Sequence, residues 1–197
     1  KTGEPGNVLI EADNLFVADN RGLMAVNGVS LKVRAGEILG VAAIEGNGQS
    51  ELVEALTGMR SVKQGQIYIC GQEASGRDPG EIRKMGLAHI PEDRISTGVA
   101  MPSSITDNMI IGKERRSEFS VKGIHLKRSS VARYARELFD KFDLRGAGVD
   151  TEVGSLSGGN MQKVVIAREF SFDADIYVIA QPTRGVDIGA IEFIHQR

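Results

Sequence analysis

A glycine-rich loop, which follows an apolar segment and precedes a helical one, constrains the fold of this chain more than any other feature. The segment Glu37–Ala42 is apolar without alternation, which predicts a strand buried on both faces of a sheet. The loop 43–50 comes next, and Leu52, Val53 and Leu56 behind it stand at helical spacing. A strand, a loop and a helix in this order are typical of α/β folds with a mainly parallel sheet.

The glycines of this loop allow the backbone to curl so that its N–H groups point inward, and a helix N-terminus favours a bound anion. Phosphate-binding loops of this kind end in Gly-Lys-Ser/Thr, with the lysine on the terminal phosphates and the hydroxyl on magnesium. Gly48 and Ser50 fit that pattern, whereas Gln49 stands at the lysine position and carries no charge. The candidate nucleotide-binding residues are Gly46, Asn47, Gly48, Gln49, Ser50 and Glu51, with Ser50 as a candidate weak magnesium ligand. A glycine-rich turn that binds nothing is the alternative interpretation.

Other apolar segments predict further strands, of which the early ones add an antiparallel edge to the sheet and the last is buried. The predicted strands are Val8–Val17, Ala25–Arg34, Gln66–Cys70, Gly86–Ile90 and Ile176–Ala180. Between Glu92 and Gly154 the pattern becomes helical, with an apolar stripe along Ser130–Phe142. We expect a linker or vector-derived remnant at 1–7, an α/β core at 8–91 and 155–197 that is cut short at its C-terminus, and a helical subdomain at 92–154.

A second glycine-bearing motif opens another predicted helix. Its residues are Leu156, Ser157, Gly158, Gly159, Asn160 and Gln162. Ser157 can cap the helix, and the two glycines would let another molecule approach the backbone closely. An ordinary serine-capped helix is the alternative interpretation of the same residues.

The third motif is Gln181-Pro182-Thr183-Arg184-Gly185-Val186-Asp187, directly after the last strand. Leu-Ser-Gly-Gly, a hydrophobic strand and Pro-Thr-x-Gly-x-Asp in this order resemble the ATP-binding domains of ABC transporters, which have a P-loop NTPase fold. The segments 46–51, 91–94 and 160–163 narrow the resemblance to the second, C-terminal ATPase half of tandem sugar or nucleoside importers of the ribose/galactose type. Gln49 together with Ala-Gln-Pro-Thr favours the nucleoside branch.

The resemblance implies roles for several residues, and at four positions the chain departs from the active pattern. Ala180 stands at the Walker B aspartate position and Gln181 at the catalytic glutamate position, so no residue here is a competent catalyst. Glu92 stands where a glutamine senses the γ-phosphate, so its negatively charged carboxylate would face the negatively charged phosphate. Gln49 replaces the lysine. Gly185, Val186 and Asp187 correspond to the D-loop, and the histidines His89, His125 and His195 are interpreted as structural or solvated.

From this resemblance we expect an asymmetric division of work between two ATPase units facing each other head to tail. This domain would give its signature motif to the competent site of its partner, while its own site binds ATP weakly, with magnesium as a second candidate ligand. The expected partners are the N-terminal ATPase domain of the same full-length chain, the membrane permease subunits and, indirectly, a solute-binding protein. The segment Asp93–Gly112 would meet the permease at the cytoplasmic face of the cell membrane.

Composition and charge argue against several other classes of function. A net charge of −2 gives no electrostatic reason to expect nucleic acid as a partner. The single cysteine, Cys70, excludes an internal disulfide, and no apolar run approaches the ~20 residues of a membrane helix. We expect the full-length protein to be an ATPase and the isolated chain to be nearly inactive. A non-transport ABC ATPase of the repair or translation type, or a structural domain that binds no nucleotide, are the alternatives.

Overall fold

The computed structural model describes residues 5–44, 46–186 and 191–192 of the 197-residue chain. Its contacts divide the chain into two compact units, Lys1–His89 with Asp173–Val178 and Ile90–Phe172 with Ile179–Arg197. Each unit has its own hydrophobic cluster. The boundaries expected for the helical subdomain, at residues 92 and 154, remain a prediction.

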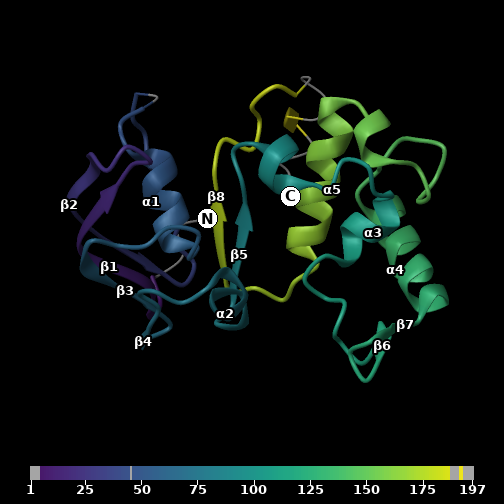
Figure 1. Ribbon diagram of the computed structural model, residues 1–197, viewed down its shortest axis with the longest axis horizontal. Helices are drawn as coiled ribbons and strands as arrows, with labels where there is room; N and C mark the ends of the chain where they lie inside the picture. The colour runs from purple at the N-terminus through teal and green to yellow at the C-terminus, as the bar shows by residue number, and fades with distance from the viewer. Residues whose placement is uncertain (1–4, 45, 187–190, 193–197) are drawn as a thin grey trace. The chain divides into compact units, whose positions relative to one another are not determined.

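The first unit is built on an antiparallel sheet with strand order β2-β1-β3-β4. Its strands are β1 (Val8–Ala18), β2 (Met24–Arg34), β3 (Gln64–Ile69) and β4 (Gln72–Glu73). Helix α1 (Gln49–Leu56) lies beside this sheet (Figure 1) and buries Leu52, Ala55 and Leu56 in its core. A short helix, α2 (Pro79–Lys84), begins with a capping box between Asp78 and Glu81. The predicted antiparallel strands and the helix after the glycine-rich loop are confirmed.

Two further strands, β5 (Leu87–Ile90) and β8 (Ile176–Ile179), pair with each other and run in the same direction. The Ile176 N–H donates to the Gly86 carbonyl at the start of the pair, and the Ala180 N–H donates to the Ile90 carbonyl at its end. A parallel pair far apart in sequence is the α/β element that the sequence predicts. The chain therefore has the predicted α/β class. Over the residues that the structure describes, the antiparallel strands form a sheet of their own, rather than an edge of a mainly parallel sheet.

Two strand predictions need correction. The segment Glu37–Ala42 forms no strand, and its side chains are exposed, with Ile38 97% accessible. In β8 only Ile176 is buried, whereas Tyr177 and Ile179 are exposed. A strand buried on both faces needs hydrogen-bonded neighbours and covering layers. Among the described residues, 37–42 has no neighbouring strand and β8 has one.

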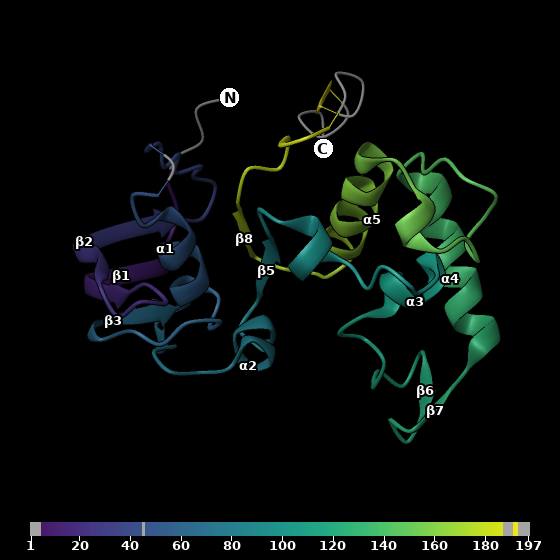
Figure 2. The ribbon, with the colours of Figure 1, turned by 45° about the horizontal axis from the view of Figure 1, so that its top comes forward.

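The second unit is mostly helical, with α3 (Ile105–Ile110), α4 (Arg128–Lys141) and α5 (Gly158–Phe170) lying together (Figure 2). Helix α5 is buried on nearly all sides, while α4 buries one stripe that includes Val131, Ala135 and Leu138, as predicted. The unit also contains a π-type turn, η1 (Arg94–Gly98), a 3-10 turn, η2 (Val153–Ser155), and a hairpin of β6 (Ser120–Val121) and β7 (His125–Leu126). Within the described part of the chain, no helix is long and apolar enough to cross a membrane.

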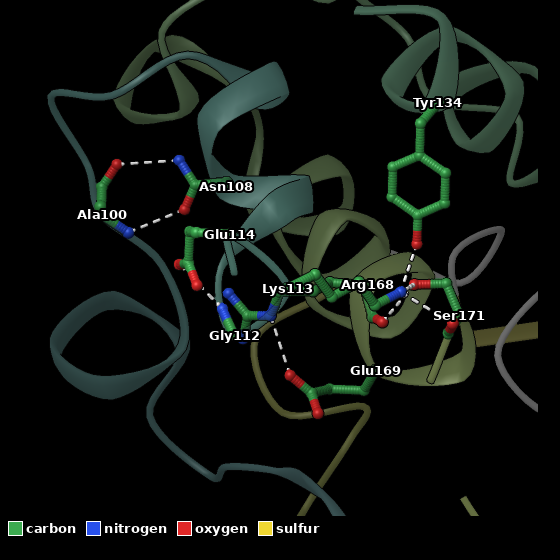
Figure 3. Close-up of polar contacts among 9 residues, drawn as sticks. All are labelled: Ala100, Asn108, Gly112, Lys113, Glu114, Tyr134, Arg168, Glu169 and Ser171. Carbon is green, nitrogen blue, oxygen red and sulfur yellow. Dashed lines mark hydrogen bonds and ion pairs between the residues drawn. The ribbon is translucent and has the colours of Figure 1, made fainter. Parts of the chain in front are cut away.

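Polar side chains fix the loops of this unit to its helices, as Figure 3 shows. Asn108 is fully buried in α3, where its carboxamide accepts from the Ala100 N–H at 2.8 Å and donates to the Ala100 carbonyl at 3.0 Å. Lys113 is also buried and donates to the Tyr134 hydroxyl and to the carbonyl and hydroxyl of Ser171. The contacts of Lys113 thus tie the segment after α3 to the middle of α4 and to the C-terminal end of α5.

Replacing Asn108 with alanine should therefore destabilise the second unit. The Asn108→Ala variant leaves the Ala100 N–H and carbonyl without their partner inside the protein, and we expect a loss of about 2–3 kcal/mol in the free energy of unfolding. Urea denaturation measures the loss. Asn27→Ala, at an exposed position in β2, is the control and should stay within about 0.5 kcal/mol of wild type. Equal stability of the two variants would contradict the role given to Asn108.

Candidate functional site

Two glycines of the glycine-rich loop in the first unit have left-handed backbone conformations. Gly46 and Gly48 both have φ of 90°, in the left-handed region, and Gly48 caps the start of α1. A Cβ on Gly48 would lie 2.3 Å from the carbonyl oxygen of Ala25 in β2, so glycine alone fits there. A helix N-terminus carries a partial positive charge that favours an anion, which is the basis of the binding site predicted from the sequence.

The side chain at the lysine position closes the loop on itself. Gln49 Nε2 donates to the Ile44 carbonyl at 2.9 Å, and Gln49 Oε1 accepts from the Asn47 N–H at 3.2 Å. The same Asn47 N–H also reaches the Ile44 carbonyl at 3.2 Å. One of the N–H groups that a phosphate would use is thus already engaged, and Gln49 brings no positive charge. Phosphate binding by this loop remains a prediction, and the loop supplies less positive charge than the active pattern.

The residues predicted as the signature motif lie at and just before the start of α5 in the second unit. Ser157 is its N-cap, and its hydroxyl accepts from the Asn160 N–H at 3.4 Å and from Asn160 Nδ2 at 3.1 Å. The predicted cap is confirmed. Ser157 is exposed and Leu156 half-buried, whereas Gly159 and Gln162 are buried.

Gly158 is close to other parts of the same chain. A Cβ on Gly158 would lie 2.7 Å from Arg94 Nη2 and 3.0 Å from the carbonyl oxygen of Gly185. The sequence suggested that this glycine makes room for another molecule. In the structure it also makes room for an arginine of its own unit, because the Cβ direction is occupied.

The residues at the Gln-loop and catalytic positions contact each other. Gln181 Nε2 donates to Glu92 Oε1 at 2.8 Å, and the Arg184 guanidinium forms an ion pair with the same carboxylate. The sequence predicted that the Glu92 carboxylate faces the γ-phosphate, whereas in the structure it faces the Arg184 guanidinium of its own unit. Gln181 has a φ of 42°, which is uncommon for a residue other than glycine. Ala180 continues the β8 pairing and offers only a methyl group.

Sequence reasoning missed the part played by Arg94. Its Nη1 donates to the Arg184 carbonyl at 2.7 Å and its Nη2 to the Gly185 carbonyl at 3.0 Å. No local pattern marks this contact, because the partners are 90 residues apart. The second unit therefore brings together Glu92, Gln181, the predicted D-loop residue Gly185 and the start of α5. No contact shown in the part of the chain that the structure describes places Val186 among them. Gly46–Glu51 belong to the first unit, and Asp187 and His195 lie outside the described residues.

The two histidines within the described residues are interpreted from the sequence as structural or solvated. His89 is on strand β5, and His125 is exposed in the hairpin of β6 and β7.

A glycine-bearing loop before α1, a serine-capped helix with Gly-Gly and a loop after β8 together define an ATP-binding cassette. The sequence model of the ABC transporter family matches residues 26–184. The chain is 42% identical over 194 residues to a nucleoside import ATP-binding protein of Lactococcus lactis, covering 98% of this chain and 38% of that protein. It is 39% identical over 197 residues to a guanosine import ATP-binding protein of Bacillus subtilis, covering all of this chain and 38% of that protein.

A ribose import ATP-binding protein of Rubrobacter xylanophilus is 36% identical over 188 residues, covering 95% of this chain and 36% of that protein. Solved structures share the fold. A dimeric ATP-binding cassette bound to ADP and phosphate matches with a TM-score of 0.78 at 20% identity, covering 95% of this chain and 80% of that one. The chain belongs to the ABC transporter ATP-binding family, and it spans little more than a third of the length of these relatives.

The two loop glycines should respond differently to alanine. Gly48→Ala combines a left-handed backbone with a contact of 2.3 Å to the β2 backbone, so we expect a loss of about 3 kcal/mol or more in stability. Gly46→Ala has the same φ but open space around the added methyl group, so only the backbone strain of about 1–2 kcal/mol applies. Urea denaturation of both variants measures the difference. A larger loss for Gly46→Ala would contradict the packing of the loop against β2.

Proposed function

We propose that this chain is a degenerate nucleotide-binding domain of an ABC importer for sugars or nucleosides, which completes the competent ATP site of a partner domain. The observation that carries the proposal is the contrast between its two loops. The phosphate loop has no cation and is closed by Gln49, whereas the first turn of α5 keeps its serine cap and both glycines. One loop is weakened as a binding site, and the other is intact as a donated surface.

The residues of the chain's own site support weak ATP binding and slow hydrolysis there. Phosphoryl transfer depends on positioning and charge neutralisation, and a charge-assisted hydrogen bond contributes about 1.5–3 kcal/mol. Losing the lysine alone would weaken phosphate binding by about tenfold to a hundredfold. Gln181 can orient water by a hydrogen bond but cannot accept a proton, and loss of a general base costs on the order of 10²–10⁴ in rate.

The names of the relatives support import as the process, because they are called import ATP-binding proteins for nucleosides, guanosine and ribose. Those relatives are much longer than this chain, which leaves room for a second ATPase domain in the same polypeptide. The proposed partners are that N-terminal domain, the permease subunits and, indirectly, a solute-binding protein, at the cytoplasmic face of the membrane. ATP would be turned over with magnesium in the partner's site.

Substitution in the two loops of the full-length protein, assembled with its permease, tests the asymmetry. Ser157→Arg should abolish ATP turnover because a long cation fills the donated surface, whereas Gln181→Ala should change turnover less than about threefold. Phosphate release measures both. Robust hydrolysis by the 197-residue chain alone would contradict the proposal. So would failure of a fluorescent ATP analogue to bind this chain at millimolar concentration, which favours a structural domain that binds no nucleotide.

We also propose that the turn after Glu92 is the surface that couples this domain to the permease. Asp93 caps η1 by accepting from the Ile95 N–H at 2.9 Å and from the Ser96 hydroxyl at 2.7 Å. The Ser96 hydrogen bond lowers the pKa of Asp93, so the cap is complete above the ordinary carboxyl pKa and is lost as pH falls through the lowered value. Asp93 and Arg94 are thus engaged within the chain, and Ile95, 53% exposed, is the apolar group that the turn presents.

Coupling is therefore better tested at Ile95 than by reversing the charge of Asp93 or Arg94. Ile95→Glu should lower solute uptake by about tenfold, because burying a charge at an interface is costly, while ATP hydrolysis continues. Uptake into proteoliposomes, measured with hydrolysis, separates the two. Ile124→Glu, at a 76% exposed isoleucine beside β7, is the matched control and should leave uptake unchanged. Equal uptake by both variants would contradict the proposal.

A further inference from the structure

Two arginines join the segment after β5 to the segment after β8. Arg184 reaches the Glu92 carboxylate with its guanidinium, and Arg94 reaches back to the Arg184 carbonyl at 2.7 Å. The Ala180 N–H bound to the Ile90 carbonyl ties the same two segments at their base. We call the contacts among Glu92, Arg94, Arg184 and Gly185 the arginine clasp. Because both segments supply a cation and an acceptor, neither can move away without breaking charge-assisted hydrogen bonds.

The clasp also touches the signature helix. Arg94 Nη2, which binds the Gly185 carbonyl, lies where a side chain on Gly158 would be. Gly158 is the first residue of α5, directly behind the Ser157 cap. The guanidinium of Arg94 therefore lies between the D-loop backbone and the first turn of the signature motif.

Electrostatics alone would not place an arginine there. The N-terminus of a helix carries a partial positive charge, so a guanidinium beside it is unfavourable. What holds Arg94 in place is the pair of carbonyl oxygens of Arg184 and Gly185, which its planar fork reaches with two separate nitrogens. A lysine carries the same charge on a single nitrogen and has no such fork.

We propose that Arg94 is a positioning residue, which fixes the D-loop segment against the first turn of α5 so that Ser157–Gly159 are held in one orientation. The inference rests on the proposed function, in which this turn completes a partner's ATP site. The contacts that define the clasp all join residues of the second unit, to which the signature motif also belongs.

The test uses the full-length protein with its permease and compares Arg94→Lys and Arg94→Met with Arg133→Lys, at an exposed arginine on α4. In both Arg94 variants kcat for ATP hydrolysis should fall about tenfold or more, with a smaller change in KM, because two charge-assisted contacts are lost. Amide hydrogens of residues 158–161 and 184–186 should exchange at least about tenfold faster. The Arg133→Lys control should match wild type in both readouts.

Wild-type turnover and exchange in Arg94→Lys would overturn the proposal. A single positively charged nitrogen would then hold the segment as well as the two donor nitrogens of arginine. If the Arg94 variants do not fold, Gly158→Ala disturbs the clasp from the other side, since its methyl group meets Arg94 Nη2. Faster exchange at 184–186 in Gly158→Ala supports the clasp, and unchanged exchange overturns it. Ser157→Arg separates the two proposals: if it leaves turnover unchanged, the donated-signature function fails, and the exchange measurement alone decides on the clasp.

Discussion

The ion pair between Glu92 and Arg184 is the contact on which the arrangement of the second unit's functional loops depends. It places the Arg184 guanidinium against the Glu92 carboxylate, which the sequence-based prediction leaves facing the nucleotide. With that charge balanced internally, Gln181 can donate to the same carboxylate, and Arg94 can bind the carbonyls beside Arg184. The residues at these positions bind one another through their side chains and backbone carbonyls. A domain without its own catalytic groups, as proposed above, can therefore keep these loops structurally ordered.

The same principle holds in the glycine-rich loop. Gln49 is too short and uncharged to take over the work of a lysine on terminal phosphates, but its carboxamide offers a donor and an acceptor at once. Both are used within the loop, on the Ile44 carbonyl and the Asn47 N–H. A lysine, with donors only, could not satisfy the Asn47 N–H in this way. The hydrogen bonds of Gln49 therefore stabilise the loop itself, which agrees with the weak phosphate binding proposed for it.

Local signals in the sequence predicted local structure well. The glycine-rich loop, the helix behind it, the Ser157 cap and the antiparallel early strands all follow from residues a few positions apart. Burial of the strands was harder to predict, because it depends on which elements cover the two faces of a strand. The apolar run 37–42 has the composition of an interior strand but no neighbouring strand among the described residues. The contacts of Arg94, Asn108 and Lys113 were not foreseen, because their partners carry no mark in the sequence.

Gly48 and Gly158 both stand at the start of a helix, but glycine is needed at the two positions for different reasons. Gly48 is required by its left-handed backbone and by the β2 carbonyl that it touches, so it supports the first unit whether or not a nucleotide binds. Gly158 has no backbone requirement of that kind, and the atoms nearest to the position of its missing Cβ belong to Arg94 and Gly185. It stands at the start of a helix that is buried on nearly all sides, whereas the Ser157 cap in front of it is exposed. The body of α5 is thus fixed by its own burial, and the contact with Arg94 and Gly185 bears on the orientation of its first turn.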